Sequence, residues 1–461
     1  MIKYIVFLLC SLFILSILLV PERRLIINVG LLIIFMLGRI ILRKQKIYSI
    51  YSLSAYLIFF SITALFVILN YHYFTLGNNY ASPNLDRDAL LYHNLAIKLL
   101  DKYTSISDLR INYFGYPIVL SLVYKLFGRD IIYGLLLNML VMMNCLILSG
   151  KLAFQLLEKR IDKVRIAGYA MLFLCFIPIF IRPGCELNKD SYIILSVLLI
   201  MTNINETITQ IASIKRLFYI AVGILILALF RPPYLLMVIV AILLIYQKRF
   251  LKHIVISMIT LSIIISALII GMRYSLYSDP ISLIDSQVIN NEVGKQINAT
   301  SDSVVVRLIG ANYRSHNFIQ KAELLPVTFA IQWLLPIPFS NHPESIPRVP
   351  VFVFAHNMNI LWYIVSYFII LYFFFVAKKE PNDLLKKGMF ASLFLFSIPA
   401  FTEGGLTTRY IVPFIPMIVS GGAYSLYLIK CNVYFKNKSI KMIVILFLSI
   451  GIATGIYLAI K

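Results

Sequence analysis

Residues 131–157 read IIYGLLLNMLVMMNCLILSGKLAFQLL, an apolar run whose only charge is that of Lys151. A helix needs roughly 20 mostly apolar residues to cross a lipid bilayer, so this run is long enough to span one. Similar runs recur along the 461-residue chain, which is 60% hydrophobic and 13% charged. Soluble domains carry about 25% charged residues, so the composition predicts an all-α, polytopic membrane protein.

Working outward from residues 131–157, the apolar runs predict about 13 transmembrane helices. The first run lacks a small-residue cleavage site and leads straight into a second one, so we interpret it as a retained helix rather than a signal peptide. We divide the chain into an N-terminal helix pair (1–52), a core (53–430) and a C-terminal helix (431–461). The predicted spans are residues 4–20, 25–42, 53–74, 131–157, 166–183, 191–207, 216–231, 233–247, 254–272, 353–377, 388–403, 410–430 and 442–460.

Basic residues gather in short clusters between the predicted spans. If the N-terminus lies inside, 22 of the 42 lysines and arginines fall on the cytoplasmic side, against 5 of the 20 acidic residues. That asymmetry follows the positive-inside rule and sets the predicted orientation. The same clustering accounts for the formal net charge of +22, so we expect the lipid bilayer, and not nucleic acid, to be the partner of these charges.

Two long segments, residues 75–130 and 273–352, fall outside in this topology. Within the first, leucines recur at four-residue spacing between positions 86 and 100, which predicts an amphipathic helix. A second amphipathic piece, 116–127, is too short to span, so we place both pieces along the outer membrane surface. The segment 273–352 is polar and then proline-rich, and its length exceeds that of ordinary connections, which is typical of a functional or disordered loop.

The residues that can carry chemistry open the first of these surface helices. Asp86 and Asp88 precede Tyr92 and His93, and Asp88 shares a helix face with Tyr92 four residues later. A carboxylate there can take a proton from a sugar hydroxyl as a general base, or hold a divalent cation, for which Asp88 is the candidate ligand. The alternative is structural: both acids only cap and solvate an exposed helix.

Short motifs in the outer segments carry a resemblance to a known family. They are Asp88-x-x-x-Tyr92-x-x-x-Ala96, Tyr116-Pro117, Leu122 to Gly128, Asn188-Lys189-Asp190-Ser191 and the stretch from Glu403 through Arg409 to Pro416. Together they resemble the outer loops of GT-C glycosyltransferases, in the branch with protein O-mannosyltransferases and the lipid A aminoarabinose transferase. There are two departures: many relatives carry adjacent Asp-Glu where this chain has Asp88-Ala89, and two spans precede the usual first one.

The resemblance implies a membrane glycosyltransferase with a polyprenyl-phosphate- or polyprenyl-diphosphate-linked sugar donor and a glycan or lipid-linked acceptor. It implies that Asp88 is the catalytic base, with Asp86 and Asp190 as supporting acids. The carrier phosphate needs cations, and planar guanidinium groups hold phosphate well. In the predicted topology, Arg182, Lys189, Arg231, Arg273 and Arg409 lie at the outer ends of spans. The candidate substrate-binding residues are Tyr92, His93, Lys189, Arg231, Arg409 and Glu403.

Two other functions stay open. The long loop 273–352 also resembles bacterial O-antigen and capsule polymerases, which join whole repeat units. A transporter or flippase of lipid-linked oligosaccharides is the alternative of another class. Ion-coupled carriers keep ionisable groups near the bilayer midplane, whereas acids occur here only near the ends of the predicted spans, and we find no internal repeat. We therefore expect an enzyme of surface polysaccharide or lipopolysaccharide assembly, in a bacterial cytoplasmic membrane, with its site facing outside.

Overall fold

The computed structural model describes residues 2–75, 87–101, 115–157, 162–209, 213–231, 233–246, 318–334, 350–377, 384–403, 410–432 and 435–437. Within these ranges all regular secondary structure is helical and no strand is present, as the apolar runs predict. The elements are α1 (Ile2–Leu19), α2 (Arg24–Arg43), α3 (Ile50–Thr75), α4 (Arg87–Asp101), α5 (Gly115–Phe127), α6 (Ile131–Leu156), α7 (Lys163–Leu174), α8 (Pro178–Ile181), η2 (Arg182–Gly184), α9 (Asp190–Thr209), α10 (Ile214–Phe230), α11 (Pro233–Tyr246), α15 (Phe318–Leu334), α16 (Pro350–Asn357), α17 (Ile360–Leu371), the π-helical turn η4 (Tyr372–Val376), α18 (Leu384–Glu403), η6 (Val412–Phe414) and α19 (Ile415–Cys431).

Five helices are long and apolar enough to cross a membrane, or six if one bent pair counts as a single span. They are α2, α3, α6, most of α18, and η6 with α19. Other helices coincide with predicted spans but are shorter or less apolar, and the predicted spans 254–272 and 442–460 lie outside the described residues. The structure is thus compatible with a membrane protein, while the predicted number of about 13 spans is not confirmed.

The predicted span 166–183 is the bent pair, in which α7 and the following α8–η2 segment meet at 87°. Pro178 opens α8, and Ile177 before it has an extended backbone with φ −108° and ψ 97°. A proline disfavours the helical conformation of the residue before it, because its ring clashes with that residue's backbone, so the chain turns here. The turn carries residues 185–190 across α6, where the Asn138 amide donates a hydrogen bond to the Asn188 carbonyl oxygen at 3.0 Å.

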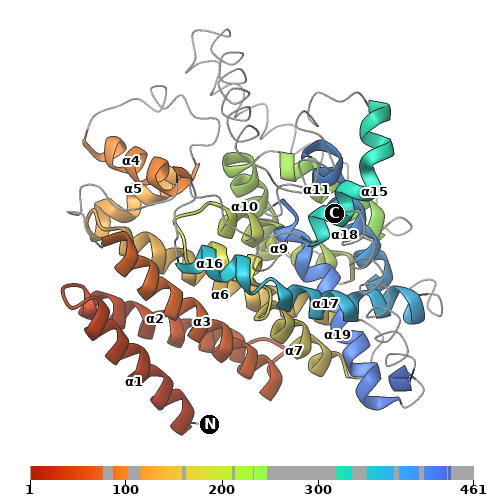
Figure 1. The fold of residues 1–461 in the computed structure, drawn as a ribbon, viewed down its shortest axis with the longest axis horizontal. Coiled ribbons are helices and arrows are strands. Elements are labelled where there is room, and N and C mark those ends of the chain that lie inside the picture. Colours follow the sequence, from red (N-terminus) through yellow and green to blue (C-terminus); the bar gives the residue numbers. More distant parts are fainter. Residues whose placement is uncertain are drawn as a thin grey trace, which may run out of the picture.

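The two amphipathic segments are helices, as predicted: they are α4 and α5, which pack on each other (Figure 1), while their placement along the outer membrane surface stays a prediction. The leucine spacing predicted α4, and its buried face is made by Leu95 together with Ala89, Tyr92, His93 and Ala96, while Leu91 is exposed. The α5 helix in turn contacts α6 and α10. This double layer covers one end of the helix bundle, which we call the α4–α5 end.

Loops that the sequence separates into two sets lie at opposite ends of the bundle. At the α4–α5 end, the Asp130 carboxylate caps α6, accepts a hydrogen bond from the Tyr71 hydroxyl at 3.1 Å and pairs with Arg23 at 2.8 Å. At the other end, the start of the α2–α3 connection and residues near the facing ends of α6, α7, α9 and α10 line one cavity, so we call it the cavity end. The alternation of the loops therefore follows the predicted topology within the described helices.

The predicted loop 273–352 contains a helix that the sequence reading missed. This helix is α15, which has Pro326 inside it and packs against α18. Trp333 near its end lies 5.1 Å from the Trp362 ring, and the Trp362 indole donates a hydrogen bond to the Trp333 carbonyl oxygen at 2.8 Å. Because a proline within a helix removes one backbone donor, the proline-rich composition favoured a loop at this position.

Candidate functional site

Four of the residues predicted for the site meet at the α4–α5 end. The Lys189 ammonium lies 5.8 Å from the centroid of the Tyr92 ring, which joins the start of α9 to α4. The next residue, Asp190, has a carboxylate oxygen 4.0 Å from a guanidinium nitrogen of Arg231 at the end of α10. Since Tyr92, Lys189 and Asp190 are all buried, the contact is part of the packed structure and not a surface encounter.

A row of aromatic rings in contact holds these helices in place. The Tyr116 ring of α5 lies 5.2 Å from the Tyr92 ring and 5.7 Å from the Tyr192 ring of α9. Tyr192 in turn stacks on Phe230 at 5.2 Å, directly before Arg231. Aromatic pairs of this kind stabilise by about 0.5–1.5 kcal/mol each beyond burial, so the row fixes α4, α5, α9 and α10 relative to one another.

A polar network fixes the loop that carries Lys189 and Asp190. The Asn138 amide donates hydrogen bonds to the Tyr116 hydroxyl at 3.1 Å and to the Asn188 carbonyl oxygen at 3.0 Å. The Asn188 side chain accepts from the Asp190 backbone N–H and donates to the Asp190 carboxylate. The negative charge thereby sits in the first turn of α9, where the helix dipole stabilises it.

Sequence reasoning missed Asn138, although a signal was present. An asparagine within a long apolar run is costly in lipid unless it is bonded, and such residues mark functional or organising positions. Here it is fully buried and ties α5 and the 185–190 loop to α6.

Arg231 is positioned mainly by an aromatic ring. Its guanidinium carbon lies 4.2 Å from the centroid of the Tyr410 ring, and the Tyr234 hydroxyl holds that segment through a 3.0 Å hydrogen bond to the Tyr410 carbonyl oxygen. The side chain is only 12% exposed, and the 4.0 Å separation from Asp190 exceeds hydrogen-bond length. Among the described residues, no acceptor takes a hydrogen bond from the guanidinium, whose planar N–H groups are suited to binding an anion.

The remaining predicted residues take other positions. Asp88 is half-buried in the first turn of α4, one turn before Tyr92 on the same face. His93 is buried against α5, with Nδ1 2.8 Å from the Tyr124 hydroxyl, so its contact belongs to the α4–α5 packing. Burial lowers the pKa of His93, and the nearby Asp130 charge partly opposes that effect.

Arg182 is bound by a neighbour, because its guanidinium pairs with the Glu186 carboxylate at 3.0 Å. Glu403 ends α18, but its side chain is outside what the structure describes. Asp86, Arg273 and Arg409 lie outside the described residues altogether. The described residues contain no cluster of three or more metal-ligating side chains, so Asp88 stays a candidate ligand by prediction only.

Comparisons with protein-family models, curated proteins and solved structures find no match to this chain. The resemblance to GT-C glycosyltransferases therefore rests on the short motifs alone and stays a prediction. What the geometry adds is independent of it: two of those motifs, around Tyr92 and around Lys189, are brought into contact.

Proposed function

We propose that this protein is a membrane glycosyltransferase that uses a polyprenyl-phosphate- or polyprenyl-diphosphate-linked sugar donor at the outer face of a bacterial cytoplasmic membrane. One observation carries the proposal. Tyr92, Lys189, Asp190 and Arg231, which come from three helices far apart in the sequence, meet at the end of the bundle that bears the amphipathic helix α4. Cations, an acid and aromatic faces are the groups that a lipid-phosphate-linked sugar requires.

The cations suit the leaving group. Arg231 presents planar donors beside an aromatic ring, and Lys189 adds a second positive charge next to Asp190. Both would stabilise the negative charge that grows on the carrier phosphate as the sugar departs. The buried setting strengthens this effect, because charges interact more strongly away from water.

Asp88 supplies the base in this proposal. Its carboxylate takes the proton from an acceptor hydroxyl, the acceptor oxygen attacks the anomeric carbon, and the bond between that carbon and the phosphate oxygen breaks. The polyprenyl phosphate or diphosphate leaves with the bonding electron pair. Asp190 would keep Arg231 and the 185–190 loop in position, because it contacts both.

The reaction can be tested with full-length protein reconstituted into vesicles. The donors are supplied as a lipid extract from source cells grown with a radioactive sugar, together with the same cells' glycan acceptors. We expect label to move from the lipid carrier into glycan while free polyprenyl phosphate or diphosphate accumulates. If label crosses the bilayer but stays on its carrier, the protein is a flippase and the proposal is wrong. The length of the product, one sugar or many repeat units, separates single transfer from polymerisation.

A further inference from the structure

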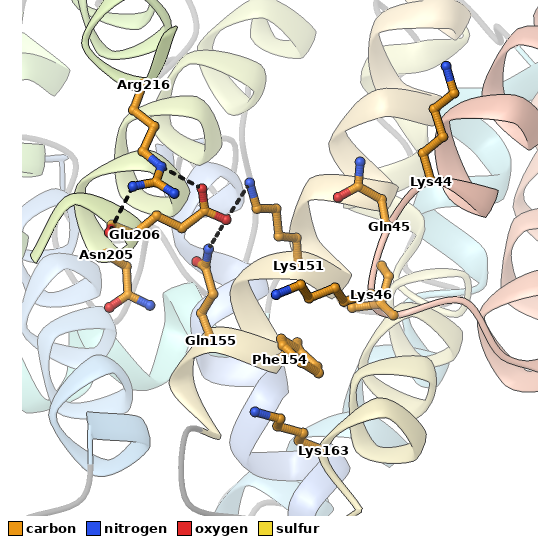
Figure 2. Close-up of a pocket in the computed structure, with 11 residues that line it drawn as sticks. Lys44, Gln45, Lys46, Lys151, Phe154, Gln155, Lys163, Asn205, Glu206 and Arg216 are labelled. Atoms are coloured by element: carbon orange, nitrogen blue, oxygen red, sulfur yellow. Dashed lines mark hydrogen bonds and ion pairs between the residues drawn. The ribbon is translucent and has the colours of Figure 1, made fainter. Parts of the chain in front are cut away.

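The cavity end holds a polar cavity of about 580 Å³, far from the residues discussed above (Figure 2). Residues after the end of α2 and residues of α6, α7, α9 and α10 build it, and five of its eleven lining residues are basic. The lining residues are Lys44, Gln45, Lys46, Ile47, Lys151, Phe154, Gln155, Lys163, Asn205, Glu206 and Arg216.

The charges around this cavity do not balance. Among the described residues that line it, the one acid is Glu206, which pairs with Lys151 at 2.8 Å and with Arg216 at 3.3 Å. Within the described part of the chain, Lys44, Lys46 and Lys163 form no ion pair, so the walls keep a strong positive excess. The uncompensated positive charges repel one another, and an anion bound between them would relieve that repulsion. The cavity is therefore expected to attract an anion.

The positive-inside rule accounts for basic residues at this end but not for their arrangement around one cavity. Lys163, the first residue of α7, lies 4.4 Å from the centroid of the Phe154 ring. Figure 2 shows Lys46 on the same side of the cavity as Lys151 and Phe154, whereas the end of Lys44 turns away from them. The walls therefore combine ammonium groups from the α2–α3 connection, from α6 and from the first residue of α7 with an aromatic face. The helix dipole favours negative charge at the N-terminal end of α7.

A neutral acceptor completes the lining. The Gln155 amide nitrogen donates to the Thr202 carbonyl oxygen and to Glu206, both at 3.1 Å. Its Oε1 atom is buried and receives no hydrogen bond within the described residues. A ligand hydroxyl next to an anionic group would satisfy it.

We propose that this cavity binds a phosphate group, carried either by an anionic phospholipid headgroup or by a soluble phosphate compound. Basic pockets between helices at the cytoplasmic side of membrane proteins bind phospholipid headgroups in this way. Lys46, Lys163 and the Lys151–Glu206–Arg216 group form the receptor. The site is distinct from the α4–α5 end, so its occupancy is separable from glycosyl transfer.

Full-length protein in detergent tests the proposal in two arms. In the soluble arm, inorganic phosphate and pyrophosphate are titrated while the thermal unfolding temperature is followed. In the lipid arm, native mass spectrometry counts phosphatidylglycerol or cardiolipin retained from mixtures with phosphatidylcholine. We expect saturable binding in one arm: stabilisation by phosphate identifies a soluble ligand, and selective retention of anionic lipid identifies a headgroup.

Matched variants localise the binding. Lys46→Gln with Lys163→Gln removes two positive charges and should weaken binding about 30-fold, which is about 2 kcal/mol at about 1.4 kcal/mol per tenfold. Lys46→Arg with Lys163→Arg keeps the charges and should bind nearly as wild type does. Lys215→Gln removes an exposed charge beside Arg216 that does not line the cavity, and should also bind normally. Binding that is absent in both arms, or equal in the double glutamine variant and Lys215→Gln, would overturn the proposal.

Discussion

Arg231 lies over the Tyr410 ring, with its guanidinium carbon 4.2 Å from the ring centroid, and the Asp190 carboxylate at 4.0 Å is beyond hydrogen-bond distance. In the proposed function, the guanidinium N–H groups bind the carrier phosphate. A lysine at the same position would keep the charge but lose both the planar fork and the stacking.

The substitution Arg231→Lys should therefore raise KM for the lipid-linked donor and lower kcat/KM about 10-fold or more, about 1.4 kcal/mol. Arg129→Lys is the matched control, because Arg129 is exposed at the same end and pairs with Asp101 at the surface. Donor titrations of the two purified variants make the comparison. Full activity with unchanged donor affinity in Arg231→Lys would show that Arg231 makes no contact with the carrier phosphate.

His93 gives a pH dependence of stability. Burial lowers its pKa, so the folded protein keeps the imidazole neutral while the unfolded chain takes up a proton below about pH 6.5. Stability falls wherever the unfolded state binds more protons, so this contribution is complete above about pH 6.5 and is lost as the pH falls through the folded pKa. His93→Gln should reduce the drop in thermal unfolding temperature between about pH 7.5 and about pH 5. An identical drop in both proteins would contradict this assignment.

At the scale of elements, the contact between α5 and α10 depends on Gly115. A Cβ atom there would lie 2.7 Å from the Phe230 ring and 3.1 Å from the Leu229 carbonyl oxygen. Gly115→Ala should push α5 away and destabilise the protein by about 1–3 kcal/mol, as overpacking does. Gly388→Ala is the control, because its Cβ would meet Leu156 at an ordinary 3.4 Å. The measurement is the thermal unfolding temperature of the two variants. Equal unfolding temperatures for Gly115→Ala and Gly388→Ala would show that α5 and α10 can move apart at no cost in stability.

The sequence predicts some of these elements better than others, for physical reasons. Helices α4 and α5 were predicted because four-residue spacing and short length are local properties of the chain. The bend after α7 was missed although Pro178 marks it, because hydropathy alone does not register backbone geometry. The helix α15 was missed because Pro326 argued for a loop, whereas packing against α18 supports a helix there.

The candidate site, too, was predicted from the sequence only in part. The motifs contained Tyr92, Lys189 and Asp190, and the predicted topology placed Arg231 at the outer end of a span, but their contacts depend on how α4, α9 and α10 pack, which no local pattern records. The aromatic row from Tyr116 to Phe230 and the role of Asn138 appear only when those helices are assembled.

For the whole molecule, a site on the outer face requires residues 75–130 and 273–352 to lie together on the outer side of the membrane. Single cysteines at positions 80 and 300, in a variant without the five native cysteines, should react with a membrane-impermeant thiol reagent added to intact cells. A cysteine replacing Lys215, at the cavity end, should react only after the cells are opened. Labelling of position 80 or 300 from the cytoplasmic side alone would reverse the orientation and remove the basis for an outer-face site.

In the proposed mechanism, the start of α4 provides the catalytic base, and one measurement addresses this role directly. Asp88→Asn keeps the size and capping ability of the side chain but removes its charge and basicity. Asp101→Asn makes the same change at the exposed end of the same helix and serves as the control. The quantity measured is glycan formed per molecule of membrane-inserted protein. We predict a loss of about 10²-fold or more in kcat for Asp88→Asn, with little change in donor affinity, and near-normal turnover for Asp101→Asn. Equal, small losses in the two variants would contradict the claim and leave Asp88 as a helix cap.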